Sequence, residues 1–161
     1  MEVRHARPDE RREVTKLWTE RWGFQRVVSR GRLHEPMGYP MLVAIAEGRI
    51  AGALTYDLRD DEMEAVTVDA FVEGAGAGRA LIEAAAAEAR GRGCRRLWLI
   101  TTNDNTPALR FYQRCGMRLA ALHRDELERS RKLKPEIPEL GLDGIPIRDE
   151  LELELRPSES P

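Results

Sequence analysis

The chain has 161 residues and a mass of 18.3 kDa, which suits one domain with its own hydrophobic core. Its 26 basic and 28 acidic residues are scattered and leave a net charge of −2, so no broad basic surface is available to bind nucleic acid. No apolar run approaches the roughly 18 residues of a membrane span, and the first ten residues lack the apolar segment of a secretory signal. We expect a cytoplasmic protein with no nucleic-acid or membrane partner, with one domain over 1–156 and a disordered tail over 157–161.

The two cysteines, Cys94 and Cys115, lie far apart and lack the spacing of a metal-binding motif. In a chain without a secretory segment, such thiols are expected to stay reduced. We predict that both are buried structural thiols, and the sequence implies no metal ion.

The first seventy residues are predicted to form several strands and one helix. Pro8 is typical of a first helical position, and apolar residues recur at helical spacing as far as Trp22. Residues 47–49 have the length and glycine content of a hairpin connection. The segment Phe24–Pro40 has no clear pattern. The strands expected here are Glu2–Ala6, Met41–Ala46, Ile50–Asp57 and Glu62–Asp69.

The second half continues the alternation. An alanine-rich helix is expected over 77–92, followed by the strand Arg96–Ile100, which is apolar on both faces, as in a central strand. Pro107 follows three cap-type residues and begins a helix that runs to about Cys115. The strand Met117–His123 completes this part. The resulting order predicts an α/β fold with a mixed sheet.

The last forty residues divide into three segments. Residues 125–134 can be helical, and prolines and glycines make the stretch from Pro135 to Pro146 irregular. In Ile147–Leu155 leucines alternate with glutamates, which predicts a half-exposed strand.

A glycine-rich turn joins a predicted strand to the helix at 77. Gly74, Gly76 and Gly78 remove side chains near the free N–H groups of the first helical turn, which favours an anion such as a phosphate. A plain tight turn is the alternative. The turn ends Gly-Arg-Ala, so it lacks the Lys-Ser/Thr of a Walker loop, and the glycine spacing differs from that of a dinucleotide fold.

A second motif lies about thirty residues later, in Asn105–Met117, which reads N-x-x-A-x-x-F-Y-x-x-x-G-M. Together the two motifs resemble the acyl-CoA-binding turn and the following signature of GCN5-related N-acetyltransferases (GNAT). Glu73 stands where that family usually has Gln or Arg, so a possible phosphate partner is replaced by a group of like charge, and backbone N–H groups would have to bind the phosphate. The resemblance spans about Glu2 to Arg156 and implies a mixed, mostly antiparallel central sheet with helices on both faces.

The resemblance implies that acetyl-CoA is the co-substrate. The turn would hold its pyrophosphate, and the strand before the turn would splay from its neighbour, so that backbone groups meet the pantetheine arm. Asn105 would either contact that arm or only cap its helix. The cofactor-binding residues expected on this basis are Val66, Thr67, Val68, Gly74, Ala75, Gly76, Ala77, Gly78, Arg79, Ala80, Asn105 and Tyr112.

The resemblance also implies roles in acetyl transfer. Tyr112 matches the tyrosine near the CoA sulfur, and with a phenol pKa near 10 it can donate a proton to the leaving thiolate. The alternative is a packed aromatic. Glu64 is the expected base for the amine, and Glu62 is the second choice on the same face of the strand. His34 and His123 are further candidates without a visible partner.

These patterns predict an N-acetyltransferase that acts directly on an amine of a small molecule or peptide. A non-catalytic acyl-CoA-binding domain of the same fold is the main alternative, and an interaction module that binds no CoA is the third. The sequence leaves open the acceptor, the acyl length and whether a homodimer forms. Specificity for the acceptor is expected to reside in Phe24–Pro40 and residues 125–147. Alternatively, residues 125–147 form a surface loop with no role in binding.

Overall fold

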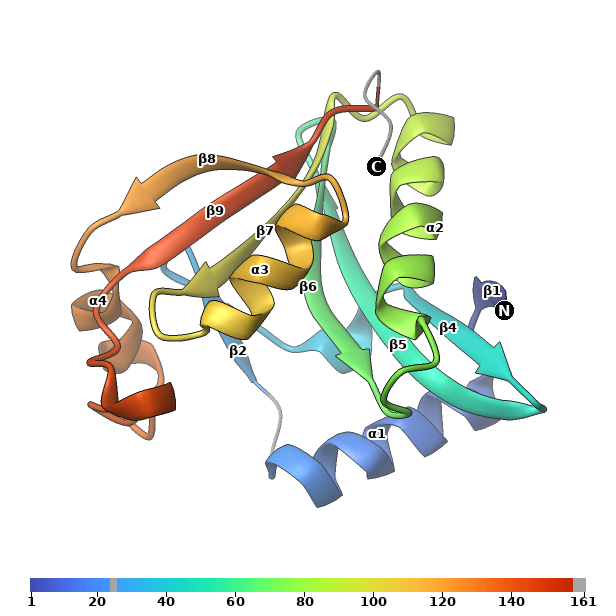
Figure 1. Ribbon diagram of the computed structural model, residues 1–161, viewed down its shortest axis with the longest axis horizontal. Helices are drawn as coiled ribbons and strands as arrows, with labels where there is room; N and C mark the ends of the chain where they lie inside the picture. Colours follow the sequence, from blue (N-terminus) through green and yellow to red (C-terminus); the bar gives the residue numbers. More distant parts are fainter. Residues whose placement is uncertain (24–25, 158–161) are drawn as a thin grey trace.

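A computed structural model describes residues 1–23 and 26–157, so Phe24, Gln25 and the predicted tail from 158 onward lie outside the described residues. A seven-stranded sheet runs through the molecule in the order β1-β4-β5-β6-β7-β9-β8 (Figure 1). Among the described strands only β6 and β7 pair in parallel, which confirms a mixed, mostly antiparallel sheet. The strands are β1 Glu2–His5, β4 Met41–Ala46, β5 Arg49–Arg59, β6 Glu62–Ala70, β7 Arg96–Thr102, β8 Arg118–His123 and β9 Glu150–Leu155.

The helices lie close to their predicted positions. They are α1 Pro8–Trp22, α2 Ala77–Gly91, α3 Thr106–Arg114 and α4 Glu126–Leu133, with short 3-10 turns at Pro36–Gly38 and Leu142–Gly144. Pro8 opens α1, and the Asn105 side chain accepts a hydrogen bond from the Ala108 N–H at the start of α3. Within the described ranges, no helix has the length and apolar character needed to cross a membrane.

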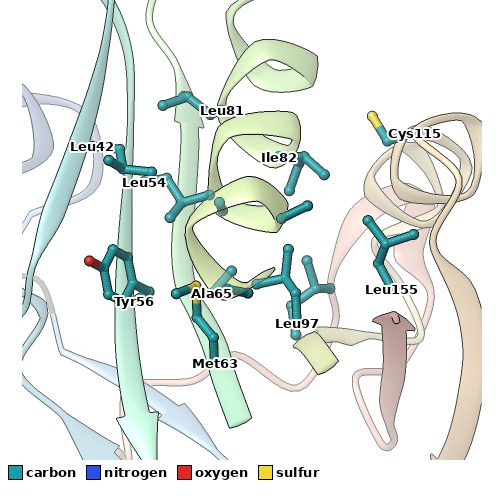
Figure 2. Close-up of a cluster of buried hydrophobic side chains, with 14 of the residues drawn as sticks. Leu42, Leu54, Tyr56, Met63, Ala65, Leu81, Ile82, Leu97, Cys115 and Leu155 are labelled. Atoms are coloured by element: carbon teal, nitrogen blue, oxygen red, sulfur yellow. The ribbon is translucent and has the colours of Figure 1, made fainter. Parts of the chain in front are cut away.

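Helices cover both faces of the sheet because neighbouring strand residues point in opposite directions. On β4, Val43 packs with Val14 and Trp18 of α1, whereas Leu42 belongs to the core beneath α2. Figure 2 shows Leu81 and Ile82 of α2 among the side chains of that second core. Both cysteines are buried in it, as predicted.

The strands β6 and β7 pair only over their first residues. The parallel register runs from Glu62 opposite Arg96 to Glu64 opposite Trp98 and then ends. Beyond this point the two strands diverge, and their arrowheads point to different sides of the molecule in Figure 1. The splay implied by the resemblance is therefore present, and it leaves the backbone of β6 unpaired on one edge.

A β-bulge lies within β6. Tyr56 of β5 pairs with Ala65, but the residue before it, Thr55, pairs with Thr67. Val66 is therefore the extra residue on β6. The bulge moves the following side chains by one step. As a result, Glu64 shares the α1 face of the sheet with Thr67 instead of alternating with it.

A small hairpin, which the sequence pattern did not reveal, lies within the described part of the segment Phe24–Pro40, residues 26–40. Its strands are β2 Val27–Ser29 and β3 Arg32–His34, joined by Arg30 and Gly31. Both turn residues have positive φ, at 50° and 72°, which is the backbone of a two-residue type I′ turn. The hairpin forms a separate two-stranded sheet.

The strand predicted at Ile147–Leu155 is present over Glu150–Leu155, but the prediction that one of its faces is exposed was wrong. The strand begins at Glu150 and is inserted between β7 and β8. Glu150 and Glu152 are only 1% and 9% exposed, because the glutamate face is covered too. There Glu152 pairs with Arg96 and His123, and the hairpin turn covers Glu150. Opposite charges and hydrogen bonds make this burial of carboxylates tolerable.

Candidate active site

The two sequence motifs meet around one cavity of about 830 Å³. The glycine turn and the start of α2 form one wall, and α3 forms the other. The first-turn N–H groups of α2 have no acceptor within their helix and carry its positive dipole end. Lining residues from the predicted site are Val68, Gly74, Gly76, Ala77, Gly78, Arg79 and Tyr112.

The three glycines of the turn serve different purposes. Gly74 and Gly76 have φ of +76° and +79°, and a Cβ on either would meet nothing within 4 Å. They provide the left-handed backbone and an open approach to the N–H groups. Gly78 instead allows α2 and α3 to approach, since a Cβ there would lie 2.7 Å from the Phe111 ring. A side chain at Gly78 therefore disturbs helix packing.

Several predicted cofactor residues lie elsewhere or have other partners. The Ala80 N–H donates to the Gly76 carbonyl (3.1 Å), so it is not a free donor. Asn105 caps α3 through its contact with Ala108 (3.2 Å). Val66 and Thr67 line a second cavity described below, and Ala75 lies between the two open glycines. Glu73 is exposed at the wall of the first cavity.

Gly76 offers a matched pair of substitutions for the anion site. Gly76→Asp and Gly76→Asn place side chains of nearly equal size at a left-handed position that both tolerate, and they differ in charge. We expect the dissociation constant of acetyl-CoA to be at least tenfold higher for Asp than for Asn, about 1.4 kcal/mol. Titration calorimetry on the folded variants measures the ratio. Equal dissociation constants would contradict an anion at this turn.

A second cavity, of about 780 Å³, lies where β6 and β7 diverge. Val27 and Val28 of the hairpin, Leu127 of α4 and Ile137 give it apolar walls. Residues from both segments that were predicted to be substrate-specific, 24–40 and 125–147, border it. The polar or charged lining residues are Arg26, Thr67, Asp69, Thr102, Ser130, Lys134, Glu136 and Glu150.

The two cavities meet at Val68, which lines both of them. Tyr112 lines the first cavity, and burial next to the Asp69 carboxylate raises the pKa of its phenol, so the phenol keeps its proton at neutral pH. Asp69 lines the second cavity and accepts a hydrogen bond from the Trp18 indole (2.7 Å). A protonated phenol and Val68 thus line the same cavity.

Glu64 is 4% exposed and lies beneath the hairpin. The Ser29 hydroxyl donates to its Oε2 (2.6 Å), and His34 Nε2 lies 3.7 Å from its Oε1. Burial, reinforced by the Asp57 charge, raises the pKa of Glu64 to about 7, although the Ser29 hydrogen bond opposes this shift. A carboxyl group with this pKa can exchange a proton near neutral pH.

The other candidate bases are engaged in ion pairs or hydrogen bonds. Glu62 binds the guanidinium groups of Arg96 and Arg95. His123 bonds to Glu152 (2.9 Å) on the far side of β7. His34 is fully buried, and its partners, which the sequence did not reveal, are Ser29 and Tyr39. Among the described residues, no group of three His, Cys, Asp or Glu side chains could hold a metal ion.

Sequence reasoning missed Ser29, Asp69 and Glu150. Ser29 and its neighbour Arg30 each donate to a buried carboxylate, Ser29 to Glu64 and the Arg30 N–H to Glu150 (3.0 Å). The available signal was Val-Val-Ser-Arg-Gly-Arg-Leu-His, two short alternating runs around a glycine. Arginine is unusual at the first position of a type I′ turn, which hid the hairpin.

A protein-family model described as the acetyltransferase (GNAT) family matches residues 4–117. The chain therefore belongs to the GNAT family of acetyltransferases. A curated relative, the uncharacterized protein YxbD of Bacillus subtilis, is 43% identical over 141 residues, which cover 86% of this chain and 87% of the relative.

Solved structures share the fold at low sequence identity. A Bacillus subtilis acetyltransferase in complex with CoA matches with a TM-score of 0.67 and 20% identity, over 96% of this chain and 97% of that chain. The putative acetyltransferase yncA from Salmonella typhimurium, with its cofactor acetyl-CoA, matches with a TM-score of 0.67 and 18% identity, over 100% of this chain and 96% of that chain.

Proposed function

We propose that this protein transfers an acetyl group from acetyl-CoA directly to an amine of a small molecule or peptide. The observation that carries the proposal is the meeting of two cavities at Val68 on a splayed strand. One cavity carries the anion-binding turn of the family, and the other offers an apolar chamber for an acceptor.

The donor takes the first cavity in this proposal. The pyrophosphate lies at the first turn of α2, and the pantetheine arm extends along the open edge of β6 to Val68. The unpaired N–H and C=O groups of that edge can hydrogen-bond the amides of the arm, as a neighbouring strand would. This contact places the thioester carbonyl at the junction.

The chemistry needs one base and one acid. An ammonium acceptor must lose a proton before its nitrogen can attack the thioester. Glu64, whose pKa is about 7, lines a separate cavity of about 110 Å³ and accepts that proton through intervening water. As the tetrahedral intermediate collapses, the carbon–sulfur bond breaks and Tyr112 donates its proton to the CoA sulfur, while the proton that leaves the amide nitrogen returns through water to the Tyr112 oxygen. The amide product and free CoA then leave through their separate cavities.

The acceptor in this proposal enters as a cation. Glu150 is 1% exposed and lines the second cavity, and its Oε1 is the oxygen that accepts the Arg30 N–H. Lys134, a basic group of the same cavity, is occupied by the Arg26 carbonyl. Glu150 therefore has an oxygen left to bind an ammonium group, and the apolar walls contact the rest of the acceptor.

Glu150→Gln tests this recognition while keeping an oxygen for the Arg30 N–H. We expect KM for the amine to rise about tenfold through loss of a charge-assisted hydrogen bond, with the dissociation constant of acetyl-CoA unchanged. Glu136→Gln, at an exposed rim position, is the matched control and should have little effect. Equal KM values for the two variants would remove Glu150 from acceptor binding.

The alternative is a domain of the same fold that binds acyl-CoA and catalyses nothing. Departure of Glu73 from the usual Gln or Arg is the feature that favours it. An assay of CoA thiol release with a panel of amines decides between the two. The proposal expects release that depends on the amine, and the alternative expects binding without release.

A further inference from the structure

A chain of hydrogen bonds leads from Glu64 through the hairpin toward the outside. Ser29 Oγ lies 2.6 Å from Glu64 Oε2 and 2.9 Å from His34 Nε2. On the other side of the same ring, His34 Nδ1 lies 2.7 Å from the Tyr39 hydroxyl. Ser29 and His34 are buried, whereas Tyr39 is half-buried between two exposed residues, Gly38 and Pro40.

Every hydrogen bond along this path is donated in the direction of Glu64. Ser29 has one hydroxyl proton and gives it to Glu64, so its oxygen accepts from His34 Nε2–H. Burial lowers the pKa of His34, which keeps the ring neutral and leaves a lone pair on Nδ1. The Tyr39 hydroxyl then donates to that lone pair.

We propose that Ser29, His34 and Tyr39 form a proton relay that carries the amine's proton from Glu64 to the surface, and that all its hydrogen bonds reverse direction when Glu64 is protonated. The proposal rests on the proposed function, because Glu64 must first act as the base. Tyr39, at the outer end, is the exit.

The step balances with one proton in and one proton out. In the protonated state Glu64 donates to Ser29, Ser29 donates to His34 Nε2, and the Nδ1–H donates to Tyr39. Each group then passes its proton one place along, and Tyr39 releases its own proton to water. The chain is left with Nε2 protonated and Glu64 as a carboxylate, which is the arrangement that the hydrogen bonds above define. Rotation of the hydroxyls and exchange of the ring proton reset it.

The charged groups around Glu64 set the pH at which the reversal occurs. Burial has the largest effect on the pKa of Glu64 and raises it. Asp57 of β5 raises this pKa further, whereas Arg32 of β3 and Arg59 of β5 lower it. These groups act on Glu64 by charge, whereas Ser29 donates a hydrogen bond to its carboxylate. Ser29 therefore begins the hydrogen-bonded path from Glu64 through the hairpin, and the other side of the carboxylate borders a cavity of about 110 Å³ between Arg59 and Trp98.

The first test needs no substrate. In protein labelled with ¹⁵N-histidine, nuclear magnetic resonance should show His34 as the neutral Nε2–H tautomer above about pH 7 and as the neutral Nδ1–H tautomer below it. In Glu64→Gln the change of tautomer with pH should be lost. A single tautomer at every pH in the parent protein, or a His34 that becomes charged in this transition, would overturn the relay.

The second test uses turnover. Tyr39→Phe keeps the edge-to-face packing on the His34 ring (5.7 Å between centroids) and removes the exit hydroxyl. We expect kcat to fall about tenfold. The pH at which the rate falls on the acid side of the profile should stay the same as in the parent. Ser29→Ala should also lower kcat and should move that limb about one pH unit higher, because the carboxylate loses its donor. Ser29→Thr, which keeps a hydroxyl, should hold the limb at the parent position.

The outcomes separate this inference from the proposed function. If Glu64→Gln is impaired while Tyr39→Phe and Ser29→Ala match the parent in kcat, the relay is wrong and Glu64 remains the base. If Glu64→Gln itself matches the parent, the assignment of the base fails and the relay fails with it.

Discussion

Tyr112→Phe should lower turnover about 10²-fold while acetyl-CoA binds with nearly its original affinity. The substitution keeps the ring, which packs against Phe111 at 5.5 Å between centroids, and removes only the hydroxyl. Burial raises the pKa of that hydroxyl, so the parent enzyme holds a proton there throughout the neutral range. Steady-state kinetics and calorimetry measure the two quantities separately.

In Tyr112→Phe the rate of acyl transfer should fall more for a thioester with a poor leaving group than for one with a good leaving group. Thioesters whose thiolates need no protonation should react with Tyr112→Phe almost as fast as with the parent, because the missing proton is no longer limiting. Phe111→Leu is a useful comparison, since it disturbs the same helix without touching the hydroxyl. Unchanged turnover in Tyr112→Phe would make Tyr112 a packing residue.

Glu64→Gln should lower turnover near neutral pH by about 10²-fold and regain part of it at higher pH, where solvent supplies more free amine. Glutamine keeps the size and can still accept the Ser29 hydrogen bond, but it takes no proton in this range. In the parent enzyme kcat/KM should fall below about pH 7 as Glu64 becomes protonated, and this limb should be absent from the variant.

Glu62→Gln is the control on the same strand. Glu62 is held by Arg96 and Arg95, so its loss should affect stability more than turnover. A parent-like pH profile in Glu64→Gln would end the role of Glu64 as base. An effect confined to Glu62→Gln would move that role two residues along the strand.

The helices and most of the sheet follow from local pattern and capping. The alanine-rich stretch after Gly76 predicted the ends of α2 to within a residue or two. The cap residue Asn105, followed closely by Pro107, did the same for the start of α3. The position of β9 did not follow, because its insertion between β7 and β8 is set by long-range pairing. For the same reason the period of two in Ile147–Leu155 could not show that both faces are covered.

The donor side of the site was easier to predict than the acceptor side. The two motifs bring their own local geometry, and the structure places both around one cavity. The surroundings of Glu64 depend on the hairpin, whose partners lie 35 residues away in sequence for Ser29 and 120 for Arg30. No pattern along the sequence could join these residues.

The most direct test of the account measures free CoA and acetylated amine together, with purified protein, acetyl-CoA and a panel of amines, amino acids and peptides. We expect at least one amine for which CoA appears one-for-one with acetylated product, and for which both fall in Tyr112→Phe and Glu64→Gln. Tight binding of acetyl-CoA with no amine raising CoA release above hydrolysis would contradict it and would identify a non-catalytic acyl-CoA-binding domain.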